Sequence, residues 1–128
     1  MKQIIHTEQA PAPIGPYSQA VLVNDTLYTS GQIAIHPTTG EMILDNIPDE
    51  TLQVMKNLEA VLHAAEMDFS MVVKSSIFIS NMDNFQAINE VYAQFFSPEN
   101  APARETVQVA RLPKDVNVEI SMIAVRPK

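Results

Sequence analysis

The sequence has 128 residues, a length that fits one domain spanning 1–128 with a buried core. It carries eight basic and fifteen acidic residues, a net charge of −7, and no cysteine. This composition excludes disulfides, thiolate catalysis and cysteine-ligated metals, and it argues against nucleic-acid binding, which needs clustered lysine and arginine. No apolar run approaches the ~20 residues that span a bilayer, and the N-terminus lacks the apolar stretch of a signal peptide. We therefore expect a cytoplasmic protein without a membrane segment.

The first third of the chain predicts three strands. Residues 2–8, 17–24 and 26–33 have strand composition, and the segment APAPIGP holds three prolines, which exclude a regular helix there. Gly31 lies inside the third strand, in the segment TSGQI, and it is one of only three glycines in the chain. A glycine at such a place indicates a bulge or the close approach of another group to the backbone.

Two helices and a fourth strand follow. Residues 48–65 repeat apolar side chains at helical spacing, and Asp49 and Glu50 suit the positive end of the helix dipole. Residues 71–79 alternate as a strand, and a second helix is expected to begin near the cap Asp83. With two last strands the order is βββ-α-β-α-ββ. This order predicts an α+β domain, a single mixed β-sheet with two helices packed on one face.

The segment APARETVQVARLPKDVNVEI, residues 101–120, predicts a β-hairpin formed by the last two strands. Its loop is expected at 112–115, and this loop length places Gln108 opposite Glu119. Arg104 would then lie about 13 Å along the strand from the point opposite Glu119. The two side chains are therefore expected to form two walls of one site, or to belong to two neighbouring sites.

The alternation of these two strands predicts which side chains face the helices. The expected set comprises Val107, Val109, Val118, Ile120 and Met122. The opposite face would then hold four polar side chains, Arg104, Thr106, Gln108 and Glu119. Apolar residues such as Ile123 and Val125 share that face. Because so mixed a face usually meets another subunit, we infer an oligomer.

Two charged residues of this face are candidates for chemistry, and each has a structural alternative. Arg104 can bind a carboxylate through two parallel hydrogen bonds, or it can form an ion pair with an acidic residue of the chain. Glu119 in a half-enclosed site can position or deprotonate a water molecule, or it can be an exposed strand carboxylate. Tyr17 can be a hydrogen-bonding wall or a simple strand aromatic.

Other common site chemistries have no support in the sequence. His6, His36 and His63 lie on three different elements without ligand spacing, so no metal site is predicted. The glycine-rich nucleotide loops and the G-x-S-x-G motif of serine hydrolases are absent, so no nucleotide cofactor or serine nucleophile is expected.

Taken together, several segments resemble, in order and spacing, the RidA family, also called YjgF. These segments are APAPIGPYSQA, LYTSGQIAIHPTTGE, NLEAVLHAA, VVKSSIFISNMDNFQAINEVYAQFF and PARETVQVARLPKDVNVEISMIAV. The resemblance covers essentially the whole chain as a single RidA-like domain, and VARLPKDVNVEI with its upstream PAR is the most specific tract. It implies a chorismate-mutase-like fold assembled as a homotrimer with three clefts between subunits.

The resemblance also implies an activity, that of a 2-iminobutanoate/2-iminopropanoate deaminase. Such an enzyme hydrolyses reactive 2-enamine or 2-imine acids, among them 2-aminoacrylate, to 2-oxo acids and ammonia without a cofactor. By position, Arg104 matches the family arginine that binds the substrate carboxylate, and Glu119 matches the acid that positions the hydrolytic water. The other implied cleft residues are Tyr17 and Ser30, together with Gly31 and Thr106 through their backbone.

The sequence departs from the family pattern at three places. Thr106 stands where many members carry cysteine, Glu66 stands where a glycine commonly ends the helix, and Ala34 replaces a frequent proline. A backbone role of residue 106 survives this change, whereas a thiol role does not. Neither Arg104 nor Glu119 is affected.

Two other functions stay open on the sequence. A non-enzymatic trimer can bind a small carboxylate in the same cleft and regulate a partner protein, and this function needs Arg104 but not Glu119. A ribonuclease or translation-inhibitor role, associated with some relatives, is disfavoured by the acidic net charge.

Overall fold

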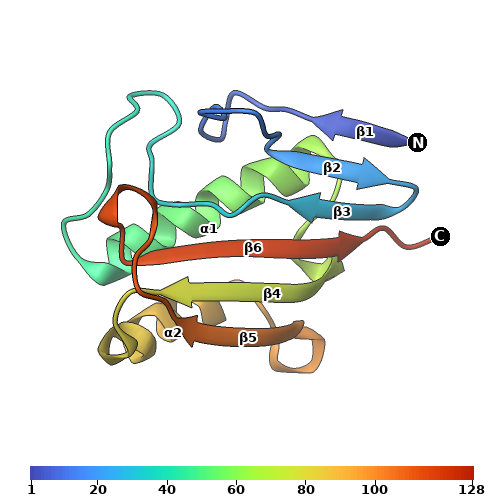
Figure 1. Ribbon diagram of the computed structural model, residues 1–128. Helices are drawn as coiled ribbons and strands as arrows, with labels where there is room; N and C mark the ends of the chain where they lie inside the picture. The colour runs from blue at the N-terminus through green and yellow to red at the C-terminus, as the bar shows by residue number, and fades with distance from the viewer.

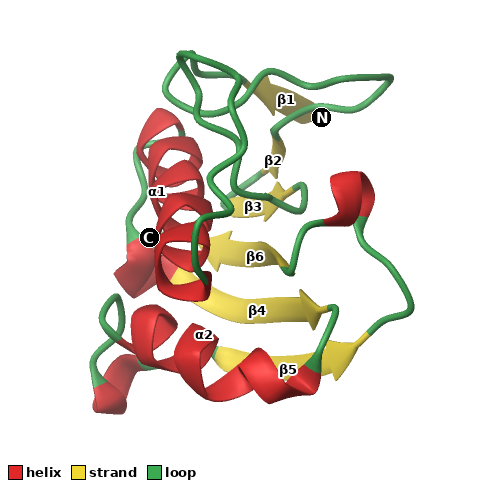
Figure 2. Ribbon diagram, turned by 90° about the vertical axis from the view of Figure 1, so that its left-hand side faces the viewer, coloured by secondary structure: helices red, strands yellow, loops and turns green.

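In the computed structural model, which describes residues 1–128, the chain forms six strands and two helices. The strands are β1 (Lys2–Ile5), β2 (Ala20–Val23), β3 (Thr26–Thr29), β4 (Val72–Ile79), β5 (Ala103–Gln108) and β6 (Val118–Val125). The helices are α1 (Ile47–Ala64) and α2 (Phe85–Ala93). The sheet order is β1-β2-β3-β6-β4-β5, and both helices cover the same face (Figure 1, Figure 2). The predicted α+β class, with a mixed sheet and two helices on one face, is confirmed.

The helix α1 follows the predicted one closely and has well-formed ends. Its N-cap is Asn46, whose side chain accepts a hydrogen bond of 2.8 Å from the backbone N–H of Asp49. At the other end, the backbone N–H groups of Glu66 and Met67 donate to the carbonyls of His63 and Leu62. This is a Schellman motif, in which Glu66 takes the left-handed conformation (φ 60°) that usually falls to glycine. The helix exit is therefore ordinary despite the missing glycine.

The second helix begins slightly later than predicted. A short 3-10 turn (Met82–Asn84) precedes α2, and the side chain of Asn81 caps this turn by accepting a hydrogen bond from the backbone N–H of Asp83. Asn81, rather than Asp83, is therefore the capping residue. Ile88 and Tyr92 of α2 are buried against the sheet.

The main core lies between the helices and the centre of the sheet. Met55, Leu58 and Leu62 of α1 are fully buried. From β6, the side chains of Val118, Ile120, Met122 and Ala124 face this core, so the predicted face of the last strand is confirmed. The side chain of Glu119 consequently lies on the opposite, open face of the sheet.

The predicted hairpin of residues 101–120 is wrong, because β4 lies between β5 and β6. β4 and β5 are parallel strands joined through α2, which makes a βαβ unit. Parallel neighbours need such a crossover, and α2 supplies it. Residues 109–117 then cross the end of β4 on the side of the sheet opposite the helices (Figure 1, Figure 2). The register predicted from a short loop does not exist.

The inserted strand also reverses the predicted faces of β5. Arg104 is the register partner of Ser75, which in turn pairs with Met122 on the helix-covered face. Thr106 and Gln108 lie two and four residues after Arg104 in β5, so their side chains share that face with it. Val107, expected under the helices, shares the open face with Glu119 instead. Arg104 and Glu119 thus lie on opposite faces of one sheet.

Candidate active site

The segment between β1 and β2 forms one wall of a pocket, and a single buried side chain fixes it. Gln19 is only 2% exposed, and its Oε1 accepts a hydrogen bond of 2.7 Å from the backbone N–H of Thr7. Its Nε2 donates to the backbone oxygens of Thr7, Ala10 and Pro11 at 2.9, 3.2 and 2.9 Å. These bonds replace the strand pairing that was predicted to continue to residue 8. The proline-rich wall is therefore rigid.

Two hydroxyl groups lie along this pocket. Tyr17 is 51% exposed, and its Oη accepts a hydrogen bond of 3.2 Å from the backbone N–H of Ile14. The phenol hydrogen of Tyr17 is consequently available to a ligand. Ser30 donates from its Oγ to the backbone oxygen of Ser18 at 2.5 Å, which ties the end of β3 to the wall.

The strand β3 is interrupted at Gly31, as the sequence indicates. Beyond it, Gln32 pairs again with Ile120 through two backbone hydrogen bonds of 2.8 and 3.2 Å. A Cβ atom added to Gly31 would lie 2.6 Å from Oε2 and 2.9 Å from Cγ of Glu119. The side chain of Glu119 therefore occupies the space that any larger residue at position 31 would fill.

The carboxylate of Glu119 is partly buried and unpaired. It has no hydrogen-bond donor and no cation of its own chain within ion-pair distance. Burial raises the pKa of Glu119 above its ordinary value, because loss of solvent disfavours the charged form. A carboxylate with a raised pKa is a better proton acceptor than an ordinary one.

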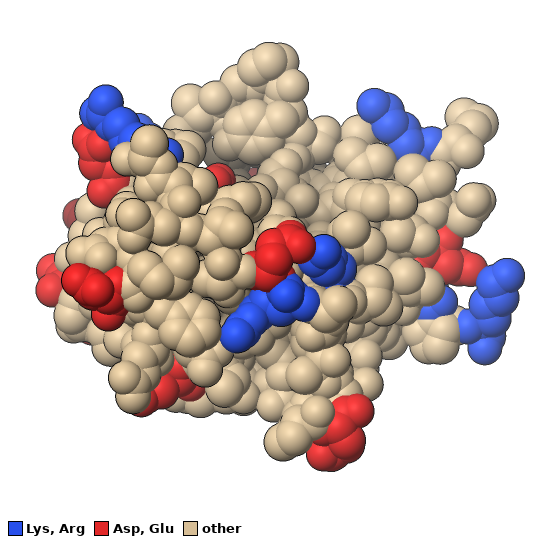
Figure 3. Space-filling view, turned by 60° about the horizontal axis from the view of Figure 1, so that its bottom comes forward, with Lys and Arg blue, Asp and Glu red and all other residues tan.

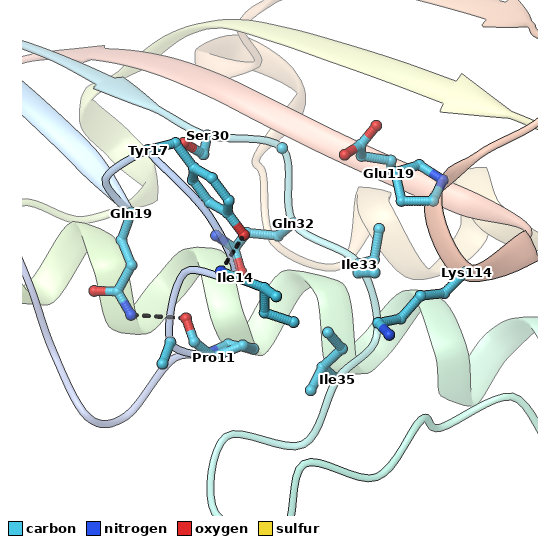
Figure 4. A pocket seen from close by; sticks show the side chains of 13 residues that line it. Pro11, Ile14, Tyr17, Gln19, Ser30, Gln32, Ile33, Ile35, Lys114 and Glu119 are labelled. Carbon is cyan, nitrogen blue, oxygen red and sulfur yellow. Dashed lines mark hydrogen bonds between the residues drawn. The ribbon is translucent and has the colours of Figure 1, made fainter.

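Figure 4 shows how the pocket is arranged around these groups. Its cavity volume is about 500 Å³. Four predicted site residues line it together, Tyr17, Ser30, Gly31 and Glu119. Apolar side chains of Ile14, Ile33 and Ile35 complete its walls, and Lys114 reaches into it from the connection between β5 and β6.

Arg104 lies elsewhere, in a second cavity of about 490 Å³ between α2 and the edge strand β5. Its Nη1 donates a hydrogen bond of 2.6 Å to Oδ1 of Asn89. Its guanidinium carbon lies 5.1 Å from the ring centre of Tyr92 and 5.6 Å from that of Phe85, within the range of cation–π contacts. No carboxylate pairs with Arg104, so the alternative of a structural ion pair within the chain is wrong.

Thr106 follows Arg104 on the same edge strand. Its Oγ1 is buried and has no hydrogen-bond partner in the chain. Nearby, Tyr92 donates from its hydroxyl to Oγ of Ser75 at 2.9 Å, and burial raises the pKa of Tyr92. As β5 is the last strand of the sheet, the backbone groups on its outer side are unpaired and can accept a ligand or another chain.

One supporting contact was not predicted from the sequence. Glu50 is fully buried, and its carboxylate accepts hydrogen bonds from the backbone N–H (2.8 Å) and the Nδ2 (2.7 Å) of Asn117. Asn117 also accepts a backbone hydrogen bond from Ser80. This contact holds the start of β6 two residues before Glu119. The position of Glu50 in the first turn of a helix suggested only a helix-dipole contact, because residue 117 is far away in sequence.

The chain is therefore a two-layer α+β protein. It has a half-buried carboxylate on the open face of its sheet and an unpaired arginine at the sheet edge. The family model described as Endoribonuclease L-PSP matches residues 7–126, so the chain belongs to this family. The resemblance to RidA proteins is thereby confirmed.

Individual relatives are similar in sequence to this chain over nearly its whole length. A RutC family protein of Saccharolobus solfataricus is 51% identical over 124 residues, which cover 97% of this chain and 98% of that one. The human 2-iminobutanoate/2-iminopropanoate deaminase is 42% identical over 126 residues, covering 98% and 91%. The crystal structure of E. coli TdcF with bound serine has a TM-score of 0.92 and 44% identity, covering 98% and 99%.

Proposed function

We propose that the assembled protein hydrolyses 2-enamine and 2-imine acids, such as 2-iminopropanoate and 2-iminobutanoate, to 2-oxo acids and ammonia. The observation that carries this proposal is the carboxylate of Glu119, which has a raised pKa and lies over Gly31 in a half-enclosed pocket. The deaminase activity named for the human relative supports the same reaction.

In the proposed mechanism, Arg104 binds the substrate carboxylate through its planar guanidinium. Glu119 holds a water molecule, accepts its proton as the oxygen attacks the C=N carbon, and returns a proton to the nitrogen. The resulting carbinolamine loses ammonia as the C=O bond forms. The phenol hydrogen of Tyr17 is available to the developing hydroxyl group. A 2-enamine acid enters this sequence after it tautomerises to the imine, as Cβ gains a proton and the nitrogen loses one to water. The imine carbon is then electrophilic, so these groups suffice for the reaction.

This mechanism requires two chains, because Arg104 and Glu119 of one chain lie on opposite faces of its sheet. We propose that the edge strand β5 of one subunit docks beside the Glu119 pocket of its neighbour. A homotrimer closed in this way contains three equivalent clefts between subunits. The backbone of Thr106 in β5 and that of Gly31 at the pocket would then line the same cleft.

The open face of the sheet supports such an assembly. Five large apolar side chains on it are at least 39% exposed, namely Ile4, Tyr28, Val73, Val107 and Val125. The face also carries the ion pair between Lys74 and Glu105 at 2.8 Å. Exposed apolar patches with polar groups among them are typical of protein interfaces. Light scattering at micromolar concentration should give a trimer mass, and a stable monomer mass would contradict the proposal.

A coupled assay tests the activity itself. A serine or threonine dehydratase generates the imine, and formation of the 2-oxo acid is followed with and without the protein. The proposal predicts faster oxo-acid formation with the protein present. An unchanged rate over a range of protein concentrations would contradict it.

The Arg104 cavity favours a second candidate function. Because Arg104 and Asn89 line a cavity of their own, apart from Glu119, a small carboxylate can be bound there without hydrolysis. The protein would then be a carboxylate-binding regulator of a partner. Binding of 2-oxobutyrate by a protein that hydrolyses no imine would favour this function.

Binding of nucleic acid is not part of the proposal, although the family description mentions a ribonuclease. On the face shown in Figure 3, lysine and arginine side chains are scattered, and the central ones lie against acidic groups. Together with the net charge of −7, this distribution supports the prediction that the chain does not bind nucleic acid.

A further inference from the structure

The pocket of Glu119 contains one other charged side chain, that of Lys114. It belongs to the short 3-10 turn Pro113–Asp115 in the connection between β5 and β6. Lys114 forms no ion pair with any acidic residue of the chain. Figure 4 shows its side chain extending into the part of the pocket lined by Ile33 and Ile35, away from the carboxylate of Glu119. The pocket therefore has a free ammonium group at one end and a carboxylate at the other.

The direction of Lys114 is set by an unusual backbone. Lys114 and Asp115 have φ values of 55° and 56°, two successive left-handed residues that are not glycine. This conformation is disfavoured for residues with a side chain, and it persists only where the surroundings fix it. Here a two-bonded ion pair between Arg111 and Asp115 fixes it, together with the hydrogen bond from the Asp115 N–H to the Leu112 carbonyl. Backbone strain of this kind is characteristic of functional sites.

The distance between the two charges leaves room for a ligand between them. Lys114 and Glu119 are not within ion-pair distance, and apolar side chains line the pocket with them. The cavity of about 500 Å³ lies in the range of sites for ligands much larger than a four-carbon acid. A substrate side chain with methylene groups and an anionic end would contact the apolar wall and the ammonium group together.

We propose that Lys114 is a specificity-determining residue, which binds an anionic group at the end of the substrate side chain and so favours dicarboxylic 2-imino acids. This inference rests on the proposed function, in which Arg104 of the neighbouring subunit binds the other carboxylate and Glu119 acts at the imine carbon. A charge-assisted hydrogen bond from the ammonium group supplies the preference.

Binding of unreactive oxo acids tests the inference without requiring turnover. Affinities of the assembled protein for 2-oxoglutarate and for 2-oxohexanoate, which has an uncharged end, are measured by titration calorimetry. The variant Lys114→Met retains most of the side-chain length. It should lower the affinity for 2-oxoglutarate, relative to the affinity for 2-oxohexanoate, by about tenfold. Lys114→Glu should reverse the preference. The matched control Lys56→Met, at an exposed position of α1, should leave the ratio of affinities unchanged.

Three results would overturn the inference. They are an equal affinity of the wild-type protein for the two acids, no binding of either, and an unchanged affinity ratio in Lys114→Met. The coupled dehydratase assay on the same proteins reports separately on the proposed function. Imine hydrolysis without a dicarboxylate preference would refute only the role of Lys114, whereas a Lys114-dependent preference without hydrolysis would refute only the proposed reaction.

Discussion

The two cavities of the chain differ in how they hold their charged groups. Around Glu119, the walls are fixed by the buried amide of Gln19, and the carboxylate lies against Gly31 without a counter-ion. Around Arg104, the guanidinium rests on the rings of Tyr92 and Phe85 and is open to solvent. The first cavity holds a partly buried carboxylate, and the second holds an accessible guanidinium.

The separation of Arg104 from Glu119 affects the pKa of the carboxyl and the pairing of the guanidinium. An arginine beside Glu119 would lower the pKa of that carboxyl and weaken it as a base, and the pairing would also occupy the guanidinium. On opposite faces of the sheet, the pKa of Glu119 stays raised and the guanidinium of Arg104 stays free of an ion pair. Only a second chain can then bring Arg104 to the pocket of Glu119.

Removal of the base should have the largest effect. Glu119→Gln retains shape and hydrogen-bond acceptance but cannot accept a proton, so imine hydrolysis should fall by about a hundredfold or more. Steady-state rates in the coupled dehydratase assay check this, with Glu66→Gln, an exposed carboxylate just after α1 and outside both cavities, for comparison. Near-normal turnover of Glu119→Gln would mean that Glu119 is only a structural residue.

Replacement of the cation should have the next largest effect. Arg104→Lys keeps the charge but loses the planar pair of donors, so catalytic efficiency should fall by roughly ten- to a hundredfold. Affinity for 2-oxobutyrate should decrease in parallel, whereas trimer assembly should persist. Arg126→Lys, an arginine that follows the last strand and lines neither cavity, is the control. Unchanged oxo-acid binding with a lower melting temperature would instead indicate a structural role.

A smaller effect is expected when the carboxylate is displaced rather than removed. In Gly31→Ala the new methyl group would overlap Cγ and the carboxylate of Glu119, so the side chain must rotate away. We expect a loss of about tenfold in turnover, with a melting temperature close to that of the wild type. At the open turn, Gly40→Ala meets no neighbouring atoms; because Gly40 has a φ of 74°, this change should lower the melting temperature slightly without reducing turnover. Equal turnover in the two variants would contradict the close approach.

The smallest effect concerns stability and pH. Burial raises the pKa of Glu119, so its ionisation destabilises the fold, and stability decreases as pH rises through the raised pKa. Hydrogen bonds from Lys74 and Ser76 lower the pKa of Glu105, whose contribution is present above its ordinary pKa and is lost as pH falls. At neutral pH, Glu119→Gln should therefore raise the melting temperature and Glu105→Gln should lower it. Both differences should disappear in acid, and changes of the same sign at neutral pH would contradict the assignment.

The sequence predicted those features of the fold and the site that depend on the pattern of residues within one strand or helix. Alternation placed Ile120 under the helices and Glu119 on the other face. The position of Gly31 inside a strand predicted a bulge or a close approach, and the structure shows the close approach of Glu119. The pairing of β5 with β4 was missed, because a strand pattern does not say which strand lies beside it. That single error put Arg104 on the wrong face. The contact of Glu50 with Asn117 joins residues 67 apart, and no periodicity reveals it.

Subunit complementation tests the central claim, that Arg104 of one chain acts with Glu119 of another. Arg104→Ala and Glu119→Gln are each expected to be nearly inactive, and the two proteins are co-expressed so that their subunits mix. Random mixing of equal amounts in a trimer gives clefts with both intact groups in about a quarter of cases, so about a quarter of the wild-type activity should return. If Arg104 and Glu119 acted within one chain, no mixed trimer would contain an intact site. Activity at the level of the separate variants, in a sample shown by mass spectrometry to be mixed, would contradict the account.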